Sequence, residues 1–153
     1  MDTAPLTNFI CEPDPENPGW KRWVMADPTR YNDVVLGRQL VRAEGAATAR
    51  LRMFPRHEHG NTGGRVHGGI VLGFADVSLF AAAYVLRGID AGRSMTVDLS
   101  AQFIGAGDLG KPLDAVVDLL RETGRMIFLR GLVVQDENIV ASFAGTIRKP
   151  SRR

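Results

Sequence analysis

VHGGIVLGFADVSLFAAAYVLR, residues 66–87, is apolar around most of its circumference when it is drawn as an α-helix. The run does not alternate apolar with polar residues, so it does not have the pattern of a strand. A helix that is apolar on nearly all sides must be enclosed by other structure. Its apolar stretch, 70–86, is shorter than the roughly 20 residues of a membrane span and carries Asp76 near its middle. We therefore expect a buried helix of a soluble protein and no membrane segment.

The residues after this helix have a different period. Residues 95–103 alternate strictly between apolar and polar side chains, which is the pattern of a half-buried strand. Three more strands are expected at 113–120, 126–134 and 139–147. The connections between these last three strands are too short for a parallel crossover, which needs a dozen residues or more, so they should be antiparallel neighbours.

The residues before the helix predict a β-hairpin. Two β-like runs, 34–41 and 46–54, flank Glu44-Gly45, a pair that suits a tight reversal. Residues 55–65 are rich in glycine, proline and histidine and should form a loop that leads into the helix. The element order predicts an α+β fold in which one long central helix is wrapped by a five- to six-stranded antiparallel sheet.

The N-terminal residues predict a less regular segment. Residues 1–18 contain four prolines and lack the pattern of a signal peptide, so we expect a loose arm. Trp20–Met25 should form a short helical turn that ends before Asp27-Pro28. The expected division is an arm with a short helix at 1–30, a single domain at 31–149 and a basic tail at 150–153.

Composition excludes several classes of protein. The chain has 153 residues, enough for one domain, and 44% of them are hydrophobic, which is too many for a disordered chain. The net charge of +2 argues against a dedicated nucleic-acid binder. Most of the basic residues are arginine, which suits forked contacts with phosphate. Cys11 is the only cysteine, so no intrachain disulfide exists and the cytoplasm is the expected compartment.

A few polar residues around the start of the helix have the chemistry of a reactive site. A helix that begins near Val66 has unpaired backbone N–H groups and partial positive charge in its first turn. Gly68 and Gly69 have no Cβ atoms that would keep a ligand oxygen away from those groups. Asp76 lies about two and a half turns beyond His67, and a carboxylate inside an apolar helix is costly unless it is paired or used.

Each of these features also has a purely structural interpretation. Asp76 could pair with an arginine such as Arg93 or Arg130, the two glycines could serve close packing, and His67 could bind backbone at the helix start. A metal site at His57, Glu58 and His59 is disfavoured because no HExxH spacing is present and no cysteine is nearby. A serine hydrolase is disfavoured because the Gly-x-Ser-x-Gly motif is absent.

The spaced set of residues resembles a known family. Asn61, then His67-Gly68-Gly69 six residues later, then Asp76 nine residues after the histidine, is similar to the pattern of the hotdog-fold acyl-CoA thioesterases of the phenylacetate-pathway (PaaI-like) type. Met95-Thr96-Val97-Asp98 resembles the strand that carries a Ser or Thr in that family. The resemblance covers roughly residues 33–149 and implies a single hotdog domain.

The resemblance also implies a reaction and the residues that perform it. The family hydrolyses the thioester between an acyl group and coenzyme A, without a metal or a further cofactor. Asp76 would then be the general base or the nucleophile, Gly68 would polarise the carbonyl with help from Asn61, and His67 would orient the loop or assist the thiolate. Thr96 would hold the water.

The family further implies a homodimer with the site at the subunit interface, assembled into a dimer of dimers (a homotetramer). Asp76 and Thr96 would come from opposite subunits. Substrate contacts are expected from Gly69 and from four arginines that are candidates for the CoA phosphates: Arg65, Arg93, Arg121 and Arg125.

Two other functions stay open. The chain could be a non-catalytic acyl-CoA or lipid-binding hotdog domain, or a thioesterase that acts on acyl-carrier protein. The acyl group is not indicated by the sequence. Its pocket is expected among large apolar residues of the helix and the following strand: Phe74, Leu79, Phe80, Phe103 and Ile104.

Overall fold

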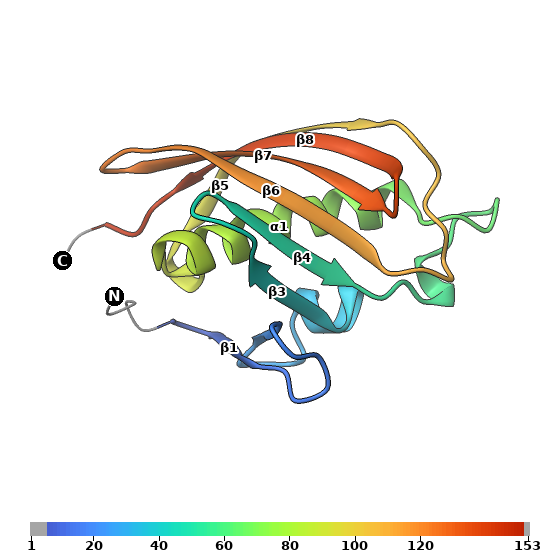
Figure 1. Ribbon diagram of the computed structural model, residues 1–153, viewed down its shortest axis with the longest axis horizontal. Coiled ribbons are helices and arrows are strands. Elements are labelled where there is room, and N and C mark those ends of the chain that lie inside the picture. Colours follow the sequence, from blue (N-terminus) through green and yellow to red (C-terminus); the bar gives the residue numbers. More distant parts are fainter. Residues whose placement is uncertain (1–5, 152–153) are drawn as a thin grey trace.

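The computed structural model describes residues 6–151 and shows one long helix wrapped by one antiparallel sheet (Figure 1). The helix α1 is Gly68–Arg87. The strands are β1 (Phe9–Pro13), β2 (Lys21–Met25), β3 (Gln39–Ala43), β4 (Thr48–Met53), β5 (Met95–Phe103), β6 (Leu113–Glu122), β7 (Met126–Gln135) and β8 (Asn138–Arg148). Three short turns of helix join them: η1 (Asn32–Leu36, π-helical), η2 (His57–His59) and η3 (Ala91–Arg93), the last two 3₁₀.

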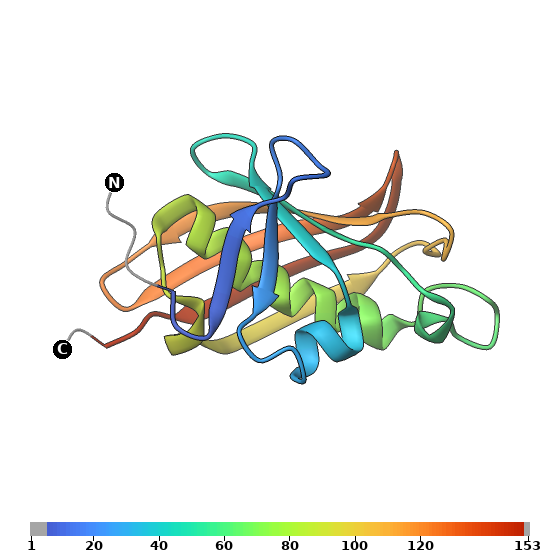
Figure 2. The same cartoon turned by 90° about the horizontal axis from the view of Figure 1, so that it is seen from below.

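The sheet has the strand order β1-β2-β3-β4-β6-β7-β8-β5, with antiparallel neighbours throughout. Strand β5 follows α1 in the chain but pairs with β8 at the far edge of the sheet, so its outer side is unpaired within the described residues. Figure 2 shows α1 running across the sheet, with β1 and β2 crossing it. The expected central helix and antiparallel sheet are confirmed.

Helix α1 is capped at both ends by residues suited to that position, His67 at its start and Gly88 at its end. His67 is extended and caps the helix, since its Nδ1 accepts the N–H of Gly69 at 2.8 Å. Gly88 ends it in the left-handed conformation, with φ of 65°. The helix lies very close to the sheet at Gly145, where a Cβ atom would overlap Leu79. Leu79 and Phe74 are fully buried between helix and sheet.

Within residues 6–151, α1 is the one helix long and apolar enough to span a membrane by composition, with a mean hydropathy of 1.9. Its position accounts for that composition, because half of the apolar window is buried inside this fold. The helix is the core of the domain, as expected.

The sheet is wider than expected because the N-terminal segment contributes two strands. Trp20–Met25, expected as a helical turn, contains strand β2, and Phe9–Pro13 in the expected loose arm forms β1. Pro13 ends the edge strand β1, where a missing N–H does not break a ladder inside the sheet. Trp23 is buried and stacks on Phe9, with ring centroids 4.9 Å apart. The sheet therefore has eight strands rather than five or six.

The first strand of the expected hairpin is also shorter than the sequence suggested. Residues 32–36 form the π-helical turn η1, in which Gly37 N–H bonds to Asn32 C=O at 3.0 Å, and strand β3 begins only at Gln39. The β-branched pair Val34-Val35 favours a strand locally, but the carboxylate of Asp33 accepts the N–H of Met25 and ties this turn to β2. The β3–β4 hairpin itself is confirmed.

Strands β1 and β2 belong to the same sheet as the rest of the chain, in place of the expected arm with a short helix, and the expected domain bounds of 31 and 149 stay a prediction. Parts of the expected arm, residues 1–5, and of the expected basic tail, residues 152–153, lie outside the described residues.

Candidate active site

Asp76 lies in the middle of α1 and is half-buried. Its Oδ1 accepts a hydrogen bond of 2.7 Å from the Oγ1 of Thr96, which stands near the start of β5. The residue pair that the sequence singled out is thus brought into contact within one chain. The expectation that Asp76 and Thr96 come from opposite subunits is wrong.

Asp76 does not pair with an arginine among the described residues. Arg130 faces Asp118 instead, with Nε 3.9 Å from Oδ2, and Arg93 donates to the backbone of Ser151. A hydroxyl partner neutralises no charge, and it leaves Oδ2 of the carboxylate without a hydrogen bond in the described part of the chain. The structural interpretation of Asp76 as half of an ion pair does not hold here.

Gly68 and Gly69, in the first turn of α1, differ in whether their backbone N–H groups have an acceptor. The N–H of Gly69 is donated to His67 Nδ1, so it is already used by the cap. The N–H of Gly68 has no acceptor in the part of the chain described here. A Cβ atom at Gly68 would lie 3.5 Å from the ring of Phe103, an ordinary contact, so packing does not require glycine there. A free donor without a neighbouring Cβ is what a carbonyl oxygen needs to approach.

Asn61 forms the turn that precedes the helix. Its Oδ1 accepts the N–H groups of Gly63 and Arg65, at 2.9 and 3.1 Å, and its backbone N–H bonds to the Arg65 carbonyl. Gly64 adopts a positive φ of 72° in the same turn. Because Oδ1 is occupied, the Nδ2 of Asn61 is the side chain's remaining hydrogen-bonding group, and it is exposed beside the helix start.

The two parts of the candidate site are separated along α1. Gly68 and Asp76 are eight residues apart, which is about 12 Å along an α-helix. A single thioester group is far smaller than this, so the Asp76–Thr96 pair and the Gly68 N–H of one chain do not reach the same carbonyl carbon.

The four candidate arginines lie in different parts of the fold. Arg65 stands in the turn before α1, Arg93 in η3, Arg121 near the end of β6 and Arg125 between β6 and β7. Figure 1 shows the β6–β7 turn at the opposite end of the sheet from the turn that precedes α1. Within residues 6–151 none of the four forms an ion pair with a carboxylate, so their charges are free for an anionic ligand.

A cavity of about 150 Å³ opens beside Asp76. Of the apolar residues expected to shape a pocket, Phe80 lines it, whereas Phe74 and Leu79 are buried in the core and Phe103 and Ile104 are exposed. Six further lining residues were not expected from the sequence, and three of them, Phe9, Trp23 and Asn32, come from the N-terminal segment. Lys21–Met25 does not alternate between polar and apolar residues, so the apolar run Trp23-Val24-Met25 was the one signal of this strand, and the neighbouring prolines obscured it.

His57, Glu58 and His59 form the turn η2 and do not converge on a common point. His59 is buried, and its Nδ1 accepts the N–H of Arg56 at 2.9 Å, so its Nε2 donates to the carbonyl of Val35 at 2.7 Å. Both ring nitrogens are used to hold η1 against η2. Among the described residues, no three His, Cys, Asp or Glu side chains gather as metal ligands would.

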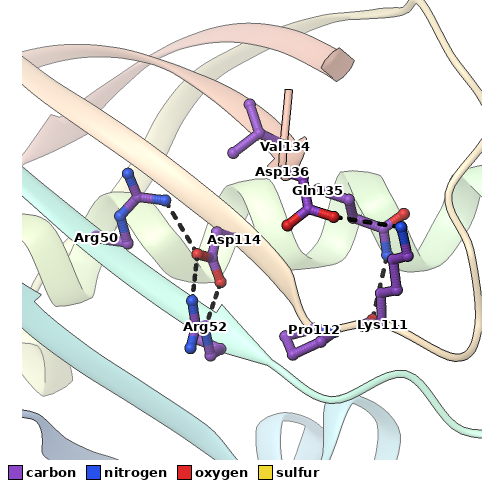
Figure 3. A pocket seen from close by; sticks show the side chains of 8 residues that line it. All are labelled: Arg50, Arg52, Lys111, Pro112, Asp114, Val134, Gln135 and Asp136. Atoms are coloured by element: carbon purple, nitrogen blue, oxygen red, sulfur yellow. Dashed lines mark hydrogen bonds and ion pairs between the residues drawn. The ribbon is translucent and has the colours of Figure 1, made fainter. Parts of the chain in front are cut away.

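A second polar cluster lies on the face of the sheet that points away from α1 (Figure 3). There Asp114 on β6 accepts hydrogen bonds from Arg52 at 2.7 and 2.8 Å and from Arg50 at 3.0 Å. The hydrogen bond to Asp114 raises the pKa of Arg52. Arg50 also pairs with Glu44, with Nε 2.6 Å from Oε1, so two carboxylates balance the two guanidinium groups, and the cluster ties β4 to β6.

Comparison with known proteins places the chain among thioesterases. A family described as the acyl-CoA thioesterase N-terminal domain matches residues 56–148. No curated protein sequence matches the chain.

Solved structures show the same fold at low identity. Thioesterase superfamily member 2 from Mus musculus is 16% identical, with 76% of this chain and 85% of that chain covered and a TM-score of 0.64. The PaaI protein of the phenylacetic acid degradation operon of E. coli is 21% identical, with 71% and 80% covered and a TM-score of 0.61. A hypothetical thioesterase from Streptococcus pneumoniae, solved with coenzyme A, is 17% identical, with 74% and 90% covered and a TM-score of 0.62.

Proposed function

The chain belongs to the acyl-CoA thioesterase family and is a thioester hydrolase of the hotdog fold, and we propose that it cleaves acyl-CoA to a free acid and CoA with Asp76 as its catalytic carboxylate. The proposal rests on the surroundings of the Asp76 carboxylate. Its carboxylate is held by one hydroxyl, faces a cavity and has no cationic partner in the described chain. A carboxylate in that state is available as a base or nucleophile.

Asp76 would act on water or on the thioester itself. As a general base it would take a proton from a water molecule whose oxygen attacks the carbonyl carbon, and the C–S bond would then break with the thiolate leaving. As a nucleophile its own oxygen would form an anhydride that water later hydrolyses. The hydroxyl of Thr96 fixes Oδ1, so that Oδ2 is the oxygen directed to the reaction.

The start of α1 would stabilise the oxyanion. The free N–H of Gly68 lies at the positive end of the helix dipole, and Asn61 Nδ2 is a second donor nearby in the chain. His67 would supply a further hydrogen-bond donor. Because its Nδ1 accepts the N–H of Gly69, the ring carries its proton on Nε2. That N–H would donate to the leaving thiolate.

A second copy of the chain would complete the site. Since about 12 Å separates Gly68 from Asp76, the carboxylate and Thr96 of one protomer would meet the helix start of its partner. Strand β5, which carries Thr96, is an unpaired edge with exposed apolar side chains, including Met95, Val97 and Phe103. Such an edge favours pairing with a second copy. We propose a homodimer, a dimer of dimers as its larger assembly, and the cytoplasm as its location.

The phosphates of CoA would bind unpaired arginines. Arg65, Arg93, Arg121 and Arg125 have no carboxylate partner among residues 6–151 and offer forked donors to phosphate. Arg65 lies in the same turn as Asn61 and is the candidate nearest in the chain to the oxyanion site. Gly69, whose N–H is used by the cap, would contribute space rather than a hydrogen bond.

The direct test is turnover of a panel of acyl-CoAs, with release of free thiol as the readout. We expect hydrolysis that is lost in Asp76→Ala, with the melting temperature of that variant near the wild-type value. Acyl groups on acyl-carrier protein are assayed in parallel. The proposal fails if no acyl-CoA is hydrolysed, or if Asp76→Ala retains activity.

A further inference from the structure

The cavity beside Asp76 is lined partly by the N-terminal segment and partly by α1 and the residues that follow it. Asp76 and Phe80 line it from α1, Phe9 and Trp23 from β1 and β2, and Asn32 from η1. The last three residues precede the part of the chain that the thioesterase family matches, residues 56–148. One wall of the cavity next to the proposed catalytic carboxylate is therefore formed by residues outside the matched range, on β1, β2 and η1, whose ribbons lie beside α1 in Figure 2.

This wall is fixed by packing. Trp23 is 1% exposed and lies between Phe9 and Tyr84, with ring centroids 4.9 and 5.8 Å away. A tryptophan held on both sides in this way does not move aside readily, because interiors are close-packed.

Hydrogen bonds also hold the N-terminal segment at η3, on another side of the cavity. Asp90, which precedes η3, accepts the N–H of Thr7 at 2.9 Å and that of Gly92 at 3.1 Å. This links the chain just before β1 to η3, whose Ala91 also lines the cavity. The N-terminal segment is thus anchored on both sides of the cavity that it lines.

The size of the cavity limits what it holds. A volume of about 150 Å³ equals that of about five water molecules at about 30 Å³ each. A longer acyl chain would have to displace the stacked aromatic rings or leave part of its length in solvent. One methylene too many in a fitted apolar pocket changes discrimination by about 10- to 200-fold.

We propose that this cavity is the acyl site of a thioesterase for short acyl groups, of about five heavy atoms, and that Phe9, Trp23 and Phe80 set the length limit. The proposal rests on the proposed function, since Asp76 marks where the thioester carbonyl lies. It adds the class of acyl group and assigns the N-terminal strands a role in specificity.

Binding and turnover test it separately. Binding of non-hydrolysable S-alkyl-CoA thioethers, from ethyl to dodecyl, is measured by calorimetry, and turnover is measured on the acyl-CoAs of the same lengths. For the wild type we expect affinity and kcat/KM to peak at short chains and to fall at least about tenfold beyond hexyl.

The length limit is tested with two partly buried rings. Phe80→Ala and Phe9→Ala, on different elements, should each raise the ratio of octanoyl-CoA to butyryl-CoA turnover by about tenfold or more. Phe128→Ala is the matched control, because it removes the same ring from an exposed position on β7 away from the cavity. Its length profile should equal that of the wild type.

The outcomes separate the two proposals. Long thioethers that bind the wild type as tightly as short ones would overturn the acyl-site inference, as would an unchanged length profile in both Phe80→Ala and Phe9→Ala. Length-dependent thioether binding that both variants relax, without any hydrolysis of acyl-CoA, would support the cavity assignment while refuting the catalytic function.

Discussion

Asp114 and Asp76 are both aspartates within regular secondary structure and at least partly buried, but their surroundings are opposite. Asp114 is buried on the outer face of the sheet between two arginines, which supply three hydrogen bonds (Figure 3). Asp76 has one hydroxyl partner and an adjoining cavity. A carboxylate whose oxygens are saturated by cations stabilises the fold, whereas one left with a free oxygen beside a cavity is available for chemistry.

The largest expected effect comes from removing the free carboxylate. Asp76→Asn should lower kcat by about 10²- to 10⁴-fold, the usual contribution of a general base, or by more if Asp76 is the nucleophile. The amide still accepts the Thr96 bond, so the melting temperature should change little. Steady-state kinetics and thermal melts on the same sample measure both. A large loss of stability with normal turnover per folded molecule would make Asp76 a structural residue like Asp114.

Asp114→Ala should have the opposite profile. Its removal leaves Arg50 and Arg52 without their shared partner, and breaking such a pair costs about 3 kcal/mol of unfolding free energy. Denaturant unfolding measures the loss. Turnover by the folded fraction should stay near that of the wild type, and a variant with wild-type stability would contradict the assignment.

A matched pair of threonines sharpens the comparison further. Thr96 donates to Asp76 at 2.7 Å, and Thr48 donates to Asp118 at 2.8 Å on the other face of the sheet. Thr96→Val should lower kcat by about 10- to 100-fold, since a hydrogen bond to a charged group is worth about 1.5–3 kcal/mol. Thr48→Val should leave kcat unchanged. Equal effects of the two substitutions on kcat would show that Thr96 has no special role.

The smallest expected effect concerns a third carboxylate. The hydrogen bond from Arg38 lowers the pKa of Asp14 from its ordinary value of 3.8 to about 2. A carboxyl whose pKa is lower in the folded than in the unfolded protein stabilises the fold at any pH above its unfolded-state pKa. That stabilisation is lost as the pH falls through the folded-state pKa. Asp14→Asn should therefore melt below the wild type at pH 7, and the two should converge near pH 2. A difference in melting temperature that is constant with pH would exclude this linkage.

The sequence predicted the central helix, its two ends and the four strands that follow it, because each has a strong periodic pattern or a glycine or histidine cap. It singled out Asp76 and Thr96 as candidate site residues, but the resemblance placed them on opposite subunits, whereas the two side chains are in contact within one chain. Two features were beyond it: β1 and β2, which prolines disguise at the sheet edge, and the π-helical turn η1. A backbone bond of His67 was one open interpretation, and the structure identifies the Gly69 N–H as its donor. The turn and the cap depend on tertiary contacts and cap geometry that no local pattern specifies.

The assignment of residues to subunits could not be predicted from spacing either. The nine residues from His67 to Asp76 place both on one helix, and only the position of β5 shows that Thr96 shares a protomer with Asp76. In the proposed dimer, one protomer would thus supply the middle of α1 with Asp76 and Thr96, and its partner would supply the start of α1.

The central claim is that two chains build each site, and a mixing experiment tests it most directly. Asp76→Asn removes the base, and Asn61→Asp keeps the loop bonds to Gly63 and Arg65 but replaces the oxyanion donor by a negative oxygen. Each variant alone should be nearly inactive. Unfolded or dissociated together and reassembled at equal amounts, they should recover about a quarter of wild-type activity, because about half of the dimers are mixed and each mixed dimer has one intact site. No recovery, from a mixture shown to contain mixed dimers, would contradict the shared site.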